Sequence, residues 1–245
     1  MKDTAKVFKV ESFGAVDGPS IRLVIFLQGC SFRCKYCHNP ESWNMDYEQA
    51  KEMSVNDILS LYEQNKAFYK KGGITFSGGE PMLSADFIKL FGKECKARNI
   101  HLAIDTSACN FLTNKQAYID LLDLVDLWIV DIKAVDPQEH EFITGSNQLT
   151  GMEFVKFLEE NKKPYWIRQV IIKTINADHA HLDKLAQFIR PLKYCQRYEL
   201  LSYHNLADDK YKKLGIDYPF KDKQMLTTPE FEEAKSYISN LLCKK

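Results

Sequence analysis

The sequence predicts an α/β fold built on a parallel sheet, either closed as a (β/α) barrel or open and doubly wound. From residue 21 onward, short β-branched and aromatic runs alternate with amphipathic stretches. Each pair takes about 25 to 35 residues, the length of a βα unit, and such alternation favours parallel strands with helices outside. The 245 residues are 45% hydrophobic, which suits one large core and predicts a single domain over residues 1–245.

Six short apolar segments are the predicted strands, at residues 21–27, 73–77, 100–105, 127–132, 165–172 and 198–203. The predicted helices lie between and after them, at residues 54–69, 84–98, 114–124, 151–160, 178–189 and 229–242. Ser54, Ser84 and Asp178 are short polar residues at helix starts, where they can cap free backbone amides. The polar stretch 205–227 is expected to be an irregular surface connection.

The overall charge argues against polyanionic partners. Lys and Arg number 33 and Asp and Glu also number 33, so no summed field favours nucleic acid or an acidic membrane. The first residues, MKDTAKVFKVESF, lack the apolar run of a secretory signal, and no segment approaches 18 uninterrupted apolar residues. We therefore expect a cytoplasmic protein without membrane association.

Three of the seven cysteines form the motif CxxxCxxC at Cys30, Cys34 and Cys37, directly after the first predicted strand. Parallel α/β folds carry their chemistry on loops at the carboxyl ends of strands. Three thiolates with no fourth cysteine nearby leave one metal position open, which is typical of a working site rather than a structural one. The other cysteines have no ligand spacing and are interpreted as ordinary residues: Cys95, Cys109, Cys195 and Cys243.

Two other interpretations of the motif remain open at this point. His38 could complete a Cys3His zinc site, although adjacent ligands such as Cys37 and His38 rarely reach one ion in tetrahedral geometry. Cys34 and Cys37 could instead form a thioredoxin-like redox pair, which leaves Cys30 without a role.

The segment VDGPSIRLVIFLQGCSFRCKYCHNPESW, residues 16–43, resembles the signature of radical S-adenosylmethionine enzymes, specifically the pyruvate formate-lyase activating enzymes. The likeness continues through SGGEP, DTS, DIK, WIRQV and YHNL, with departures at Ser20, Ala108 and Ser202. It implies a partial (β/α)6 barrel of the radical SAM type and an oxidoreductase of anaerobic metabolism. It also implies a 4Fe-4S cluster on Cys30, Cys34 and Cys37, with S-adenosylmethionine chelating the fourth iron.

The resemblance assigns the cofactor contacts residue by residue. The residues matched to S-adenosylmethionine binding are Tyr36, Cys37, His38, Gly78, Gly79, Glu80, Asp131, Lys133 and His204. Taken without the resemblance, the two glycines could form a tight turn and His204 could be a structural histidine.

The same resemblance implies two further sets of contacts. Asp105, Thr106 and Asp131 would help to hold a monovalent cation near the cofactor carboxylate. Asp17 and Arg168 would grip the substrate's loop. By residue type alone, Asp105-Thr106 could cap a helix and Asp17-Gly-Pro could simply form a turn.

The implied substrate is a second protein, pyruvate formate-lyase, whose specific glycine becomes a glycyl radical. An external low-potential donor such as flavodoxin or ferredoxin would supply the electron to a monomeric activase. No cysteine lies between Cys37 and Cys95, which favours this single-cluster type over relatives with an inserted ferredoxin-like segment. Two alternatives stay open: activation of another glycyl-radical enzyme such as anaerobic ribonucleotide reductase, and a non-enzymatic zinc-stabilised binding protein.

Overall fold

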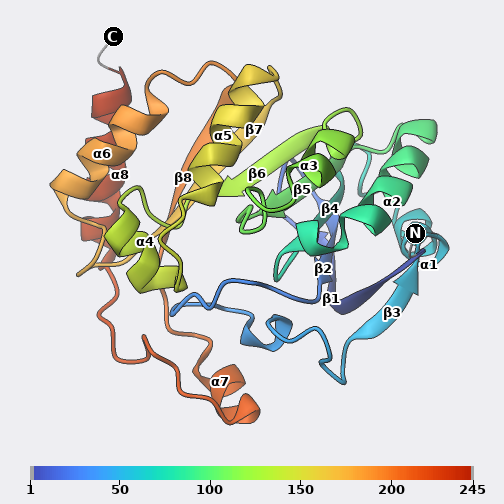
Figure 1. Ribbon diagram of the computed structural model, residues 1–245, viewed down its shortest axis with the longest axis horizontal. Helices are drawn as coiled ribbons and strands as arrows, with labels where there is room; N and C mark the ends of the chain where they lie inside the picture. The colour runs from blue at the N-terminus through green and yellow to red at the C-terminus, as the bar shows by residue number, and fades with distance from the viewer. Residues whose placement is uncertain (1–2, 244–245) are drawn as a thin grey trace.

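The computed structural model describes residues 3–243 and contains one mixed eight-stranded sheet in the order β3-β1-β2-β4-β5-β6-β7-β8. Its six parallel strands are those that the apolar segments predict. They are β2 (Arg22–Leu27), β4 (Gly73–Gly78), β5 (Leu102–Thr106), β6 (Leu127–Asp131), β7 (Tyr165–Ile171) and β8 (Cys195–Ser202). The sheet curves without closing, because β3 and β8 are separate edges, so the partial-barrel prediction is confirmed (Figure 1).

Two strands were not predicted. β1 (Thr4–Gly14) pairs antiparallel with β2, and β3 (Lys51–Ser54) pairs antiparallel with β1. β1 mixes apolar residues with Lys and Glu and is only partly buried, and β3 is a short polar edge strand. Neither has the apolar run that identifies the buried parallel strands.

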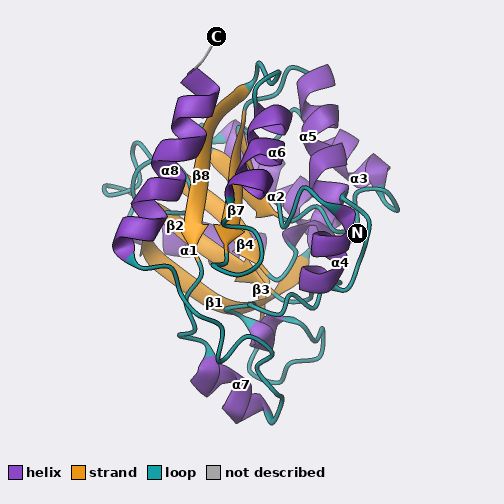
Figure 2. Cartoon of the chain, turned by 90° about the vertical axis from the view of Figure 1, so that its left-hand side faces the viewer, coloured by secondary structure: helices purple, strands orange, loops and turns teal. Residues whose placement is uncertain are grey.

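Helices cover the outer side of the curved sheet (Figures 1 and 2). The six predicted helices are present as α1 (Val55–Gln64), α2 (Ala85–Ala97), α3 (Lys115–Leu121), α5 (Thr150–Glu160), α6 (His179–Ile189) and α8 (Thr228–Cys243). Two short helices, α4 (Pro137–Thr144) and α7 (Asp208–Leu214), and two 3-10 turns, η1 (Pro40–Ser42) and η2 (Pro81–Ser84), were not predicted.

The predicted caps are only partly correct. Ser54 and Asp57 form a reciprocal capping box at α1, and Asp178 accepts a hydrogen bond from the His181 amide at α6. Ser84 makes no such bond at α2, because a turn of 3-10 helix already precedes it and its backbone is not extended. The Ser84 cap prediction is therefore wrong.

The segment 205–227 is more ordered than expected. It contains α7, and Tyr211 and Tyr218 stack in it with ring centroids 4.3 Å apart. Both rings and the buried Phe220 pack in a small apolar cluster with Phe32 and Tyr36 of the cysteine loop. The prediction of an irregular surface connection is wrong here, because aromatic residues spaced among charges bury one side of the segment.

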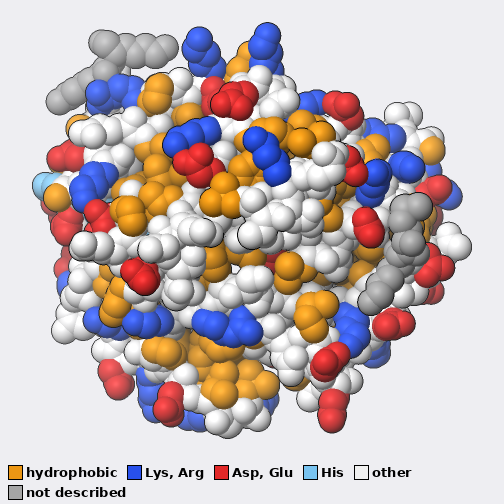
Figure 3. All heavy atoms as spheres, in the orientation of Figure 1, with side chains coloured by type: hydrophobic (Ala, Val, Ile, Leu, Met, Phe, Trp, Pro, Cys, Tyr) orange, Lys and Arg blue, Asp and Glu red, His pale blue; other side chains and the backbone are white. Residues whose placement is uncertain are grey.

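The main core lies between the sheet and the helices that cover it. Phe76 and Trp128 from the strands meet Phe87, Phe91 and Phe154 from the helices, all with 1% or less of their surface exposed. The surface shown in Figure 3 intersperses Lys and Arg with Asp and Glu, in line with the balanced composition. Among residues 3–243, no helix is long and apolar enough to cross a bilayer.

Candidate active site

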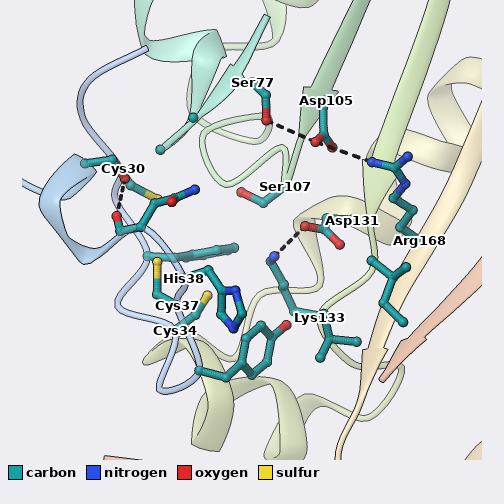
Figure 4. Close-up of a pocket in the computed structure, with 18 of the residues that line it drawn as sticks. Cys30, Cys34, Cys37, His38, Ser77, Asp105, Ser107, Asp131, Lys133 and Arg168 are labelled. Carbon is teal, nitrogen blue, oxygen red and sulfur yellow. Dashed lines mark hydrogen bonds and ion pairs between the residues drawn. The ribbon is translucent and has the colours of Figure 1, made fainter. Parts of the chain in front are cut away.

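A cavity of about 490 Å³ lies inside the curved sheet, and all three motif cysteines line it. The cysteine loop follows β2, and Gly29 (φ 99°) turns the chain where an added Cβ would lie 2.0 Å from Met45 Sδ. The amides of Arg33 and Lys35 donate to carbonyls at the end of α4, at 3.1 and 2.9 Å. The loop is thus held between β2 and α4 with its sulfurs turned to the cavity (Figure 4).

The three thiols have the chemistry of ligands to a soft metal centre. Burial raises the pKa of Cys34 to about 12 and raises that of Cys37 as well. A hydrogen bond with Cys109, together with burial, raises the pKa of Cys30. These groups are neutral thiols at pH 7 unless a metal displaces their protons.

Within residues 3–243, no three His, Cys, Asp or Glu side chains converge on the single point that one bound ion requires. A multinuclear iron–sulfur cluster makes a different demand, because each thiolate binds its own iron. Cys34 is buried and Cys30 and Cys37 are half-buried, and their three sulfurs on one wall of the cavity fit such a cluster.

The Gly78-Gly79-Glu80 turn follows β4 and packs directly against the cysteine loop. An added Cβ at Gly78 (φ 124°) would lie 2.4 Å from the backbone of Leu27, and one at Gly79 would lie 2.1 Å from the Gly29 carbonyl oxygen. The Glu80 amide donates to that same Gly29 carbonyl at 2.7 Å. The two glycines therefore allow this turn to line the cavity beside the cysteines.

The Glu80 carboxylate is completely buried and fully engaged within the protein. It accepts from the hydroxyls of Thr106 (2.5 Å) and Ser107 (2.7 Å) and from the amides of Ser107 and Met82, both at 3.1 Å. The Glu80 side chain is therefore not free to bind a cofactor. The Thr106 hydroxyl, predicted to be a cation ligand, is engaged with Glu80 instead.

Asp105 and Arg168 meet in a buried ionic cluster at the centre of the sheet. Arg168 Nη1 lies 3.6 Å from Asp105 Oδ2, its Nε donates to Glu199 at 2.8 Å, and Ser77 donates to Asp105 at 3.0 Å. Burial raises the pKa of Asp105 to about 7, against the opposing effect of Arg168. Glu199 was not predicted from the sequence as a site residue. An arginine in an apolar strand needs a partner, and Glu199 lies opposite Arg168 in the register of β7 and β8.

Asp131 ends β6 and forms an ion pair with Lys133 just after the strand, with Lys133 Nζ 2.6 Å from the carboxylate. Burial would lower the pKa of Lys133, but Asp131 beside it raises it. The ammonium lies 5.7 Å from the ring centroid of buried Tyr36. The Lys133 ammonium therefore already balances the charge of Asp131, and this pair lies on the wall opposite the sulfurs.

His38 and His204 come from distant parts of the chain and touch at the rim. Their rings lie edge to face with centroids 3.8 Å apart, and His38 Nε2 lies 2.9 Å from the His204 carbonyl oxygen. Both line the same cavity as Tyr36, as the predicted cofactor set requires.

Asp17 reaches this cavity from the other end of the sheet. It lies in the loop between β1 and β2, before the start of β2, whereas the groups described above follow the strand ends or lie on the strands. Burial raises the pKa of its carboxyl, and Arg168 Nη2 donates to the neighbouring Val16 carbonyl. The structure thus brings all the predicted site residues around one cavity except Glu80, which supports its wall from behind.

Comparison with known proteins agrees with this geometry. Residues 16–150 match the family described as "4Fe-4S single cluster domain". The pyruvate formate-lyase-activating enzyme of Streptococcus mutans is 36% identical, with 98% of this chain and 97% of the relative covered. The enzyme of that name from Clostridium pasteurianum is 37% identical, with 97% and 98% covered.

A solved radical SAM methyltransferase from Sphaerobacter thermophilus has the same fold, with a TM-score of 0.65 and 13% identity over 90% of this chain and 64% of that one. The chain therefore has the fold of this radical SAM enzyme, and its cysteine loop lies within a 4Fe-4S cluster domain. By its sequence, the chain belongs to the pyruvate formate-lyase-activating enzyme family.

Proposed function

We propose that this protein activates pyruvate formate-lyase by generating a glycyl radical on it under anaerobic conditions. The observation that carries the proposal is the convergence of Cys30, Cys34 and Cys37 with the polar groups of four strand ends on one cavity. When bound, the cluster and S-adenosylmethionine would supply one-electron cleavage of a sulfonium C–S bond, giving a 5′-deoxyadenosyl radical that takes a glycine Cα hydrogen.

The residues of the chain bind and orient the reactants. Cys30, Cys34 and Cys37 would each bind one iron of the cluster, and the Gly78-Gly79 backbone would bind the methionine end of the cofactor. Lys133, which forms an ion pair with Asp131, would contact the cofactor directly. The side chains expected to flank the adenine are Tyr36 and His38, and His204 would make a further contact with S-adenosylmethionine.

On the substrate side, Asp17 and Arg168 would receive the glycine loop at the inner end of the cavity. Arg168 is buried and Asp17 is half-buried, and the Asp105 and Glu199 carboxylates hold the Arg168 guanidinium in place. A cation near Asp105 and Asp131 remains part of the proposal, with Thr106 a ligand only if its hydroxyl leaves Glu80. The proposal also includes a monomeric cytoplasmic enzyme and a low-potential donor such as flavodoxin or ferredoxin.

The test is anaerobic reduction of the cluster-loaded protein with S-adenosylmethionine, with and without pyruvate formate-lyase of the same organism. We expect 5′-deoxyadenosine in both samples and a glycyl radical signal in electron paramagnetic resonance only with the partner. 5′-Deoxyadenosine without radical transfer to pyruvate formate-lyase would contradict the proposed substrate. Protein that binds one zinc and no iron would contradict the whole proposal.

A further inference from the structure

The loop of residues 15–21 closes the inner end of the cavity. Gly14 of β1 pairs with Arg22 at the start of β2, so the loop lies at the amino-terminal ends of the parallel strands. Val16 and Asp17 nevertheless line the same cavity as the cysteines at the opposite ends. The conformation of this loop therefore sets where Asp17 stands relative to the cofactor side.

Directly beneath the loop lies Arg22, a fully buried arginine that does not line the cavity. Its Nε donates to Thr75 Oγ1 at 2.6 Å, and its Nη1 donates to the carbonyls of Pro19 (3.1 Å) and Gly72 (2.5 Å). Its Nη2 lies 2.8 Å from the Ile74 carbonyl oxygen and 3.2 Å from His101 Nδ1.

All five N–H groups of Arg22 thus have acceptors, and each acceptor is neutral. Burial lowers the pKa of Arg22 to about 10, and no carboxylate among residues 3–243 forms an ion pair with it. A buried guanidinium is costly unless its hydrogen bonds are complete. The planar guanidinium of Arg22 therefore links β2 to β4 and to the loop through hydrogen bonds of fixed direction.

Thr75 connects Arg22 to the loop through its hydroxyl group. Its hydroxyl accepts from Arg22 and donates its own hydrogen to the Asp17 carbonyl oxygen at 2.7 Å. The next residue, Gly18, has φ 136°, and an added Cβ there would lie 2.9 Å from Arg22 Nε. On the cavity side, Arg168 donates to the Val16 carbonyl, so the loop is held from both faces.

We propose that Arg22, acting through Thr75, is a positioning residue for the activation reaction. It fixes the loop of residues 15–21, and therefore the place of Asp17 at the inner end of the cavity, without touching substrate or cofactor. The inference rests on the proposed function, because Asp17 is expected to bind the glycine loop of the partner protein. It predicts that weakening this support impairs recognition of the partner more than cleavage of S-adenosylmethionine.

The test compares Thr75→Val with Thr75→Ser, because removing Arg22 itself could prevent folding. Valine keeps the shape of threonine but removes the hydroxyl, whereas serine keeps the hydroxyl and is the matched control. Valine loses both hydrogen bonds of the Thr75 hydroxyl, to Arg22 and to the Asp17 carbonyl. We expect the KM of Thr75→Val for pyruvate formate-lyase to rise at least about fivefold, the effect of losing the one ordinary hydrogen bond that reaches the loop. Iron content, kcat and partner-independent 5′-deoxyadenosine formation should stay near those of the unmodified protein.

A second measurement does not depend on turnover. Hydrogen exchange of the backbone amides in residues 15–21 should become faster in Thr75→Val and stay unchanged in Thr75→Ser. Unchanged KM and unchanged exchange in Thr75→Val would overturn the proposal, and so would an equal loss of cofactor cleavage and radical transfer. If the unmodified protein forms no glycyl radical at all, the proposed function fails instead.

Discussion

Individual side chains in the cavity depend on neighbours from other strands. The sequence predicts that Asp105, Thr106, Glu80 and Arg168 belong to the site, and all four lie at or beside it. Their orientation could not be predicted, because it depends on which group each one meets across the sheet. Glu80, expected at the cofactor, is instead surrounded by the hydroxyls and amides that follow β5.

Arg168 gives a direct test of the buried ionic cluster. Arg168→Met leaves the largely buried Asp105 without its counter-charge, which should lower the free energy of unfolding by about 3 kcal/mol. Glu199 keeps its ion pair with Arg197 at 2.5 Å. Anaerobic urea denaturation measures this change. Lys66→Met removes an exposed ion pair with Glu63 and is the control, expected to have little effect. An Arg168→Met protein as stable as the control would show that water already solvates the ionic group of Asp105, Arg168 and Glu199.

At the scale of elements, the sequence predicts what is buried and regular better than what is short or at an edge. The six parallel strands and six long helices follow from apolar runs and periodicity. β1 and β3 were not predicted because charged or exposed residues interrupt their apolar positions. α4 and α7 are short and mostly polar, with the sequences PQEHEFIT and DDKYKKL, so neither shows the apolar periodicity that the equally short α3 has.

The start of α1 tests whether capping chemistry acts as described. Ser54→Ala removes the side chain that accepts from the Asp57 amide and should lower the free energy of unfolding by about 1 kcal/mol. Ser84→Ala is the matched control, since Ser84 makes no capping bond at α2 and its loss should be nearly neutral. Equal effects of the two substitutions in urea denaturation would refute the assignment of the caps.

The contact among α4, β7 and α6 predicts a pH dependence of stability. His181 is 2% exposed, with Nδ1 2.7 Å from Glu139 and Nε2 3.3 Å from Gln169. Burial lowers its pKa although Glu139 opposes this, so the unfolded chain binds a proton more readily than the native state. Stability from this group is therefore complete above a pH of about 6.5 and lost as the pH falls below it.

Urea midpoints between pH 5 and 7.5 measure this effect. The loss of stability on acidification should be smaller in His181→Gln than in the unmodified protein. His179→Gln, at an exposed position on the same helix, should keep the full dependence. The same acid sensitivity in His181→Gln would mean that other groups cause it.

At the scale of the whole molecule, the open curved sheet gives one cavity access to both ends of its strands. The cysteine loop and the residues after β4, β5, β6 and β8 approach from one end, and the loop with Asp17 closes the other. The sequence predicts the family and the cysteine loop, because the motif is local and its spacing specific. It does not reveal the support of that second loop by Arg22, which depends on contacts about 50 residues apart along the chain.

The most direct test of the account measures iron, acid-labile sulfide and 5′-deoxyadenosine formation in single alanine variants of the cysteines. Cys30→Ala, Cys34→Ala and Cys37→Ala should each lose the cluster and cofactor cleavage. Cys109 lies beside Cys30 but outside the motif, so Cys109→Ala is the control. It should keep about four irons and four sulfides per chain and should still cleave the cofactor. Retention of an intact, active cluster by any of the three motif variants would contradict the account.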